Sequence, residues 1–183
     1  ESAAKRRIGL GFLGLGDALI MMGLRYDSPE GREMASKISA TLRDASYSAS
    51  VELAKERGPF PMFNADQYLN TGLFAKRLPE KLRKEIRKHG LRNSHLLSIA
   101  PTGTITLAFA DNATNGIEPA FSWTYNRKKR MPDGTSRIYA VEDHAYRVYL
   151  SMGGKADALP EAFVSAQSMS AISHVEIVAA VAP

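Results

Sequence analysis

The residues best suited to chemistry lie in N-S-H-L-L-S-I-A-P-T-G-T-I-T-L-A-F-A-D-N-A-T-N-G-I-E-P, residues 93–119. The stretch begins with Leu96–Ala100, a nearly uncharged run that is typical of a strand buried on both faces. Pro101 has no N–H group and is expected to end this strand. The following Thr102-Gly103-Thr104 has turn and N-cap chemistry, so we expect a helix to open near Ile105.

A strand, a tight turn and a helix start direct unpaired backbone N–H groups at one point, and an anion such as phosphate suits that arrangement. The turn is not a Walker A loop, because no Gly-Lys-Ser/Thr follows it. The local pattern therefore leaves two hypotheses open. One is an anion site, and the other, which is commoner, is an ordinary connection between a strand and a helix.

Two further motifs invite a functional interpretation. Gly9, Gly11 and Gly14 spell the dinucleotide-binding pattern G-x-G-x-x-G. No clear strand with a terminal acidic residue follows, so the glycines instead predict close packing of a strand against a helix. Glu118 is the carboxylate of the central stretch, but no second carboxylate or histidine lies near it in sequence. We therefore expect it to order its loop by accepting a hydrogen bond, in preference to acting in catalysis.

Capping residues and apolar spacing predict the elements around this stretch. Arg7–Gly11 reads as a short strand leading into a helix that ends at Gly23. Ser28 is an N-cap before a long helix that Gly58 terminates. A second amphipathic helix should run from Pro79 to Gly90. The apolar stripe of the long helix is expected at Met34, Ile38, Leu42, Ala45, Ala49 and Leu53.

The second half of the chain predicts a hairpin and two helices. The expected strands are 121–125 and 137–141, joined by the turn 131–134. A short helix over 142–150 should end at Gly153-Gly154. Ser173-x-x-Glu176 matches a capping box that would begin a last helix.

Composition sets the broad class of the molecule. The chain has 183 residues, of which 44% are hydrophobic and 23% charged, which suits one globular unit. It contains no cysteine, which excludes disulfides and thiolate metal sites. No apolar run approaches the length of a membrane span. The first residues lack both Met and a signal core, and the last expected helix runs to the end, so we expect truncation at both ends.

The charge distribution favours acidic partners. The net charge is +5 and the pI is about 9.5. Basic residues cluster over 76–92 and again at Arg127–Arg130, just after the aromatic residues of 121–125. One hypothesis is a stand-alone nucleotide- or nucleic-acid-binding module. The favoured alternative is a solvated helix face and a charged hairpin.

Several motifs, in fixed order, resemble the catalytic barrel of ribonucleotide reductases. They are R-R-I-G-L-G-F-L-G-L-G-D-A-L, G-L-R-N-S-H-L-L, S-I-A-P-T-G-T-I and N-G-I-E-P. The continuations F-S-W-T-Y-N-R-K-K-R-M-P-D-G and V-E-D-H-A resemble the adenosylcobalamin-dependent (class II) branch. The resemblance covers essentially the whole chain.

The resemblance implies a fold and a role for the chain. The fold would be part of a ten-stranded α/β barrel, with long helices, a few buried strands and a hairpin. Residues 1–183 would be a single fragment, from the C-terminal part of the catalytic barrel of the large chain. By resemblance, the P-T-G-T-I turn holds the substrate diphosphate through backbone amides and a hydroxyl. Those residues are Pro101, Thr102, Gly103, Thr104 and Ile105.

The resemblance also implies chemistry that this chain does not carry by itself. The complete enzyme would be a cytoplasmic adenosylcobalamin-dependent reductase that converts ribonucleoside diphosphates to deoxyribonucleotides by radical chemistry. It would use cysteines and an external thiol reductant, and a homodimer is compatible with it. The family's catalytic glutamate belongs to an N-x-C-x-E motif that is absent here. We therefore expect no catalytic residue and no metal ligand in this segment, with neither a membrane nor a nucleic acid as its partner.

Overall fold

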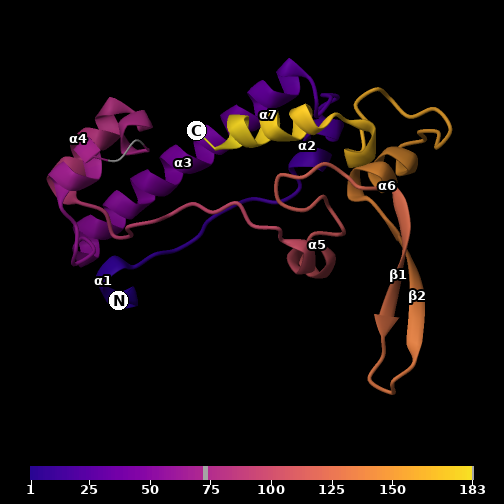
Figure 1. The fold of residues 1–183 in the computed structure, drawn as a ribbon, viewed down its shortest axis with the longest axis horizontal. Coiled ribbons are helices and arrows are strands. Elements are labelled where there is room, and N and C mark those ends of the chain that lie inside the picture. The colour runs from indigo at the N-terminus through magenta and orange to yellow at the C-terminus, as the bar shows by residue number, and fades with distance from the viewer. Residues whose placement is uncertain (72–73, 183) are drawn as a thin grey trace. The chain divides into compact units, whose positions relative to one another are not determined.

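The computed structural model describes residues 1–71 and 74–182, which fall into two compact units. Unit 1 comprises Glu1–Gly11, Ser36–Ile99 and the end of the chain from Val181. Unit 2 comprises Phe12–Ala35 and Ala100–Ala180. The long helix α3 (Pro29–Arg57) contributes residues to both units (Figure 1).

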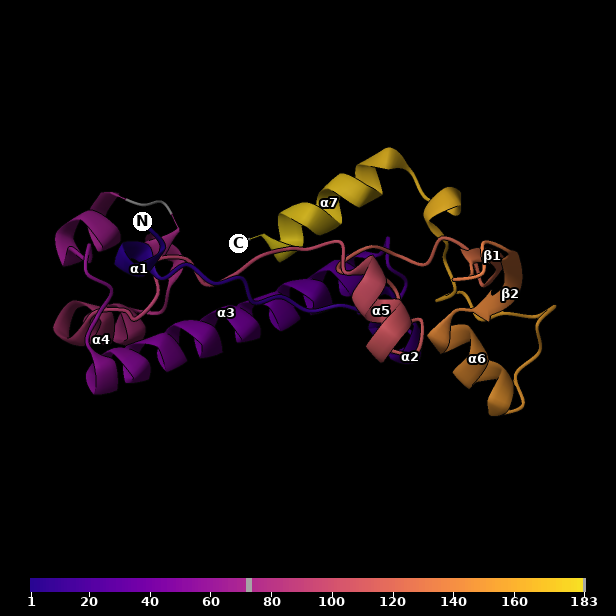
Figure 2. The ribbon, with the colours of Figure 1, turned by 90° about the horizontal axis from the view of Figure 1, so that it is seen from below.

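Unit 1 is built on the C-terminal part of α3. Helix α4 (Glu80–His89) lies beside it in both views (Figures 1 and 2). The remaining short elements of the unit are α1 (Ser2–Lys5), η1 (Gln67–Thr71) and η2 (Ala75–Arg77). Their apolar side chains form one buried cluster: Tyr47, Val51, Phe60, Leu69, Ala75, Leu78, Ile86, Leu91 and Leu96.

The ends of the two long helices confirm the predicted capping. The Ser28 hydroxyl accepts the N–H of Gly31 at 3.0 Å, as an N-cap should. Gly90 ends α4 with a φ of 78°, a backbone conformation that glycine adopts without steric cost. Ile86 of α4 is fully buried, in keeping with the amphipathic helix expected there.

The predicted apolar stripe of α3 is wrong by about one position. Leu53 of that stripe is 40% exposed, and the others are only partly buried or exposed. The buried face instead comprises Ala35, Ser39, Ser46, Tyr47, Ser50, Val51 and Ala54. The small Ala and Ser side chains allow neighbouring segments to pack closely against α3, and the serine hydroxyls can form hydrogen bonds with them. Ser50, for example, donates to the Asn93 side chain at 3.1 Å.

The two predicted strands of unit 1 lie side by side in parallel. Leu10 and Leu97 form the bridge, and the N–H of Leu10 donates to the Leu96 carbonyl at 2.7 Å. The expectation of a strand buried on both faces is only partly right. Leu96 is 2% exposed, whereas Ile99 is 52% exposed. Within the described ranges a single partner pairs with this segment, so one edge remains free.

Unit 2 contains the central turn, the hairpin and four helices. These helices are α2 (Leu15–Met21), α5 (Gly103–Phe109), α6 (His144–Ser151) and α7 (Ala171–Val181). The last residue of α7, Val181, is already assigned to unit 1. A short 3-10 turn, η3 (Ala166–Ser168), precedes α7. The antiparallel hairpin pairs β1 (Thr124–Arg130) with β2 (Ser136–Glu142), as Figure 1 shows.

Several boundaries in unit 2 differ from the prediction. Strand β1 begins at Thr124 and includes the whole basic run, while Phe121 lies outside it. Helix α6 is capped by Asp143, whose carboxylate accepts the Tyr146 N–H at 3.1 Å. The predicted capping box at Ser173 is wrong, because Ser170 accepts the Ser173 N–H at 3.2 Å and the helix begins earlier.

The secondary structure of the described residues is mixed helix and sheet. Its one regular sheet, over residues 1–71 and 74–182, is the two-stranded hairpin. The parallel bridge of unit 1 is the further strand pairing. Over the same ranges, no helix has both the length and the apolar character needed to cross a membrane.

Candidate functional site

The predicted turn at Pro101–Ile105 is held by the loop that follows α5. Thr102 has a φ of 53° and is the N-cap residue of α5. Its hydroxyl accepts the N–H of Gly116 at 2.7 Å, so its side chain serves the loop and does not cap the helix. Gly116 has a φ of 40°, and a Cβ added there would lie 2.5 Å from the Ala100 carbonyl oxygen. Only glycine fits at this position.

The five predicted residues lie together at the start of α5. The helix begins at Gly103, two residues earlier than expected. The N–H groups of Gly103, Thr104 and Ile105 are in its first turn, where the helix supplies no carbonyl four residues back. Thr104 is exposed, and Ile105 is 51% exposed. The turn therefore offers free donors at the surface of unit 2.

One buried threonine next to the turn escaped the sequence interpretation. Thr106 is 1% exposed. Its hydroxyl lies 2.9 Å from the Gly103 carbonyl and 2.9 Å from the Asn115 side-chain oxygen. Thr106 thus ties the first turn of α5 to the N-G-I-E-P loop. The sequence signal was a threonine at the second helical position after Thr104, where an apolar residue would normally face a core.

A groove of about 690 Å³ lies between α5 and the hairpin. Thr104, Leu107 and Ala108 line it from α5, and Tyr139 lines it from β2. The basic run of β1, Arg127–Arg130, completes the lining. The exposed hydroxyl of Thr104 therefore shares a surface with the strongest positive charge of the hairpin.

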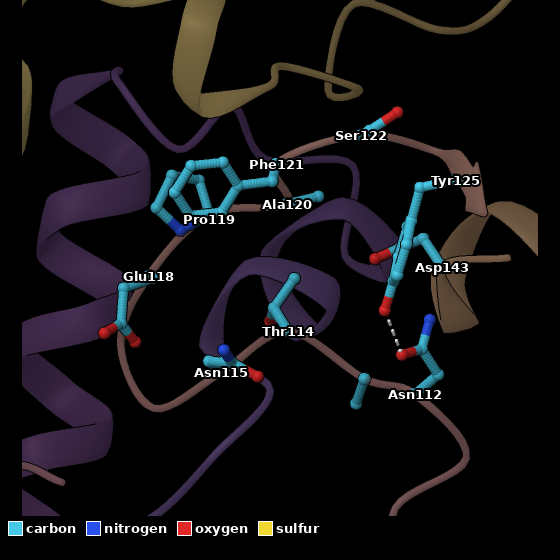
Figure 3. Close-up of a pocket in the computed structure, with 11 residues that line it drawn as sticks. Asn112, Thr114, Asn115, Glu118, Pro119, Ala120, Phe121, Ser122, Tyr125 and Asp143 are labelled. Atoms are coloured by element: carbon cyan, nitrogen blue, oxygen red, sulfur yellow. Dashed lines mark hydrogen bonds between the residues drawn. The ribbon is translucent and has the colours of Figure 1, made fainter. Parts of the chain in front are cut away.

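A second cavity, of about 270 Å³, lies under the loop that follows α5 (Figure 3). Tyr125 points at Asn112 and donates its hydroxyl hydrogen to the amide oxygen at 2.9 Å. Glu118 also lines this cavity. Its Oε2 is buried and accepts no hydrogen bond from any residue that the structure describes. Glu118 was expected to order the loop by accepting a hydrogen bond, and its Oε2 does not do so among the described residues.

Two buried carboxyl groups meet in unit 2, a pairing that the sequence interpretation missed. Asp17 of α2 is 3% exposed and Asp143 at the start of α6 is 4% exposed. Asp17 Oδ2 accepts the Thr114 N–H at 3.2 Å, and the Thr114 hydroxyl accepts the Asp17 N–H at 3.2 Å. The two carboxyl groups hydrogen-bond to each other when a proton lies between them. The sequence signal for this pairing was an aspartate near the start of a helix in each of two motifs.

Burial dominates the ionisation of this carboxyl pair. Desolvation and, next, the charge of Asp143 raise the pKa of Asp17 from its ordinary 3.8 to about 8. Burial also raises the pKa of Asp143. Like charges this close cannot both ionise without a large cost, so the pair holds one proton near neutral pH. Asp17 Oδ1 is buried without a hydrogen-bond partner among the described residues, as suits a protonated carboxyl.

The glycines of the G-x-G-x-x-G pattern permit close approach, but the neighbour of Gly9 and Gly11 is the extended segment at Ser98, so the predicted packing against a helix is wrong. A Cβ added at Gly11 would lie 2.4 Å from the Ser98 carbonyl oxygen. One at Gly9 would lie 3.0 Å from the Ser98 side chain. Gly14 is the N-cap of α2, with a φ of 79°. These contacts explain the glycines without a dinucleotide.

Known proteins with similar sequences point to one family. Its profile, described as the ribonucleotide reductase barrel domain, matches residues 1–183. A vitamin B12-dependent ribonucleoside-diphosphate reductase of Mycobacterium tuberculosis is 36% identical over 124 residues, covering 68% of this chain and 15% of the relative. A vitamin B12-dependent ribonucleotide reductase of Agrobacterium fabrum is 34% identical over 154 residues, covering 64% and 12%.

The similarity extends to a viral relative. The ribonucleoside-diphosphate reductase large subunit of Variola virus is 33% identical over 153 residues, covering 78% of this chain and 19% of the relative. The chain thus spans less than a fifth of the length of each of these relatives. Because the family profile matches over its whole length, the chain belongs to the ribonucleotide reductase barrel-domain family.

Proposed function

We propose that this chain is one segment of the large chain of an adenosylcobalamin-dependent ribonucleoside-diphosphate reductase. The complete enzyme would convert ribonucleoside diphosphates to deoxyribonucleotides by radical chemistry. The observation that carries this assignment is the match of residues 1–183 to the reductase barrel domain. The cofactor class rests on the names of the mycobacterial and Agrobacterium relatives, which are vitamin B12-dependent. A stand-alone nucleic-acid-binding module is not favoured.

Residues 1–183 would then form one contiguous piece of the ten-stranded α/β barrel. The parallel pairing of residues 8–10 with residues 95–98 supports this, because parallel strands with intervening helices are the building pattern of such barrels. Residues outside this segment would supply the remaining strands. The rest of the polypeptide, an external thiol reductant and a second copy of the enzyme are proposed partners, and the cytoplasm is the proposed compartment.

Adenosylcobalamin would supply the radical that starts the reaction in the complete enzyme. The present residues do not fit a role in that step, because the chain contains no cysteine whose sulfur could carry the radical. No residue of this segment is therefore assigned to the cofactor. Its role is to bind and orient the substrate.

The turn Pro101–Ile105 is the proposed contact with the substrate diphosphate. Its N–H groups lie in the first turn of α5, where no carbonyl of the helix accepts them and the helix dipole favours negative charge. The exposed Thr104 hydroxyl adds a further hydrogen-bond donor, and it is not bonded to any residue that the structure describes. Thr102 and Gly116 fix the turn by their 2.7 Å hydrogen bond. The segment would thus anchor the phosphates and leave the chemistry to cysteines elsewhere.

Replacing Thr104 tests this role in the complete reductase polypeptide that carries the segment. Thr104→Val keeps the shape of the side chain and removes the hydroxyl. A hydrogen bond to a charged group contributes roughly 1.5–3 kcal/mol, so KM for the diphosphate should rise about ten- to a hundredfold. The phosphates lie away from the reacting ribose carbons, so kcat should change little.

The melting temperature completes this test. Thr102, and not Thr104, is the N-cap of α5, so Thr104→Val should leave the melting temperature nearly unchanged. Thr124→Val, at an exposed threonine of β1, is the matched control and should alter neither KM nor kcat. A Thr104→Val enzyme with the KM of the wild type would refute the proposed contact.

A further inference from the structure

The basic strand β1 faces the phosphate-binding turn across the 690 Å³ groove. Thr104 belongs to one wall of this groove, and Arg127–Arg130 belong to the other. The volume falls in the range of small-molecule sites and far exceeds what one ordered ion needs. A ligand that touches Thr104 and extends from it therefore meets the side chains of β1.

Strand alternation divides the four cations into two pairs. Arg127 is directly opposite Tyr139 in the hairpin, and Lys129 is opposite Arg137. Side chains of alternate residues share a face, so Arg127 and Lys129 lie on the face of Tyr139, which also lines the groove. Lys128 and Arg130 alternate with them along the strand, with Ile138 as the partner of Lys128, and also belong to the lining of the groove. Arg127 and Lys129 are thus the two cations that share a face with Tyr139 in the lining of the groove.

These cations are electrostatically uncompensated. Across residues 1–71 and 74–182, no ion pair joins Arg127, Lys128, Lys129 or Arg130 to a carboxylate. No acidic residue lines the groove. Four adjacent positive charges repel one another, and an anion in the groove would relieve that repulsion. Arg suits phosphate because its planar guanidinium donates two parallel hydrogen bonds.

We propose that Arg127 and Lys129 form a second anion subsite, which binds the terminal phosphate of the nucleoside diphosphate anchored at Thr104. The subsite selects diphosphates over monophosphates. This inference rests on the proposed function, because it takes the turn at Thr104 as the first phosphate contact. Tyr139 and Leu107 give the groove an apolar part beside these charges.

A double variant of the complete reductase polypeptide tests the subsite. Arg127→Gln with Lys129→Gln removes both charges from exposed positions and should leave the melting temperature unchanged. Binding is measured by calorimetry for the four common ribonucleoside diphosphates and for their monophosphates. The double variant should weaken diphosphate binding about ten- to a hundredfold and monophosphate binding less than about twofold. The preference for diphosphates then disappears.

Two controls separate charge from position. Arg127→Lys with Lys129→Arg keeps both charges and should retain the diphosphate preference. Lys81→Gln with Lys155→Gln makes the same change in net charge at two exposed lysines outside the groove. That variant should bind all the nucleotides like the wild type. A matching loss of diphosphate binding in it would show a general charge effect and overturn the subsite.

The Thr104→Val variant distinguishes failure of this inference from failure of the proposed function. If Thr104→Val weakens binding and the double variant leaves the diphosphate preference intact, the subsite is wrong and the turn stands. If neither variant changes nucleotide binding, both are wrong. Single-stranded DNA is the remaining probe. Tight, steeply salt-dependent DNA binding that the double variant abolishes, with unchanged diphosphate binding, would overturn the subsite in favour of a nucleic-acid surface.

Discussion

Asp17→Asn should remove a pH dependence of stability that the buried carboxyl pair imposes on unit 2. Desolvation raises the pKa of Asp17 from 3.8 to about 8, so the native state holds a proton that the unfolded chain releases between these values. The contribution of this carboxyl group to the free energy of unfolding is therefore fully present below about pH 4 and is lost as the pH rises toward 8. Asparagine keeps the shape and remains neutral. Its amide donates to Asp143, and its carbonyl accepts the Thr114 N–H in place of Asp17 Oδ2.

The size of the effect follows from the shift. A difference of roughly four pKa units, at about 1.4 kcal/mol each, gives about 6 kcal/mol as an upper limit for the stability lost. Water that enters on ionisation lowers this value, so we expect a loss of several kcal/mol in the wild type. In the Asp17→Asn protein, where burial still raises the pKa of Asp143, the free energy of opening should vary clearly less than in the wild type over the same interval.

Native-state hydrogen exchange provides the assay. Protection is followed for peptides that contain α2 and α6, at pH values from about 4 to 8, and corrected for the intrinsic pH dependence of amide exchange. Asp157→Asn, at an exposed carboxyl of unit 2, serves as the control and should behave like the wild type. The reasoning is refuted if Asp17→Asn retains the slope of the wild type.

Three further predictions concern other parts of the chain. Ile86→Ala, at a fully buried site in the unit 1 core, should lower the free energy of unfolding by about 2–5 kcal/mol in a denaturant titration. Leu82→Ala, at a half-buried site beside that core, should lower it by less. Ser28→Ala should cost about 1 kcal/mol because it removes the acceptor of the Gly31 N–H, and Ser28→Asp should recover most of that loss. The 183-residue chain, supplied with adenosylcobalamin and a thiol reductant, should form no deoxynucleotide because it has no cysteine. Turnover by the purified chain would contradict the assignment of chemistry to other segments.

Helix ends were predictable from the sequence because their chemistry is local. Ser28 with Pro29 gave the start of α3, and Gly90 gave the end of α4. The buried face of α3 was not predictable from apolar spacing. Its contacts use small and polar side chains such as Ser50, which are buried by a partner far along the chain, Asn93. The spacing of hydrophobic residues in the sequence does not indicate such polar contacts between distant residues.

The candidate site divides in the same way. The position of the phosphate-binding turn at Thr102–Thr104 came from a contiguous motif and remains a prediction. The hydrogen bond from Gly116 that shapes the turn, and the meeting of Asp17 with Asp143, depend on tertiary structure. Asp17 and Thr114 are 97 residues apart in sequence. Neither contact could be inferred without knowing which loops meet.

The parallel pairing near the start of the chain has a consequence for synthesis. The Asn93 side chain donates to the Arg6 carbonyl across 87 residues, and Leu10 pairs with Leu97 beside it. At about 5–20 residues per second, a ribosome needs roughly 5–20 s to produce the second partner after the first. Helix α3 can form within microseconds of its emergence, long before that. The nascent segment around Ile8 and Leu10 therefore remains unpaired for several seconds, with an open edge that could pair with other chains until Leu97 is synthesised.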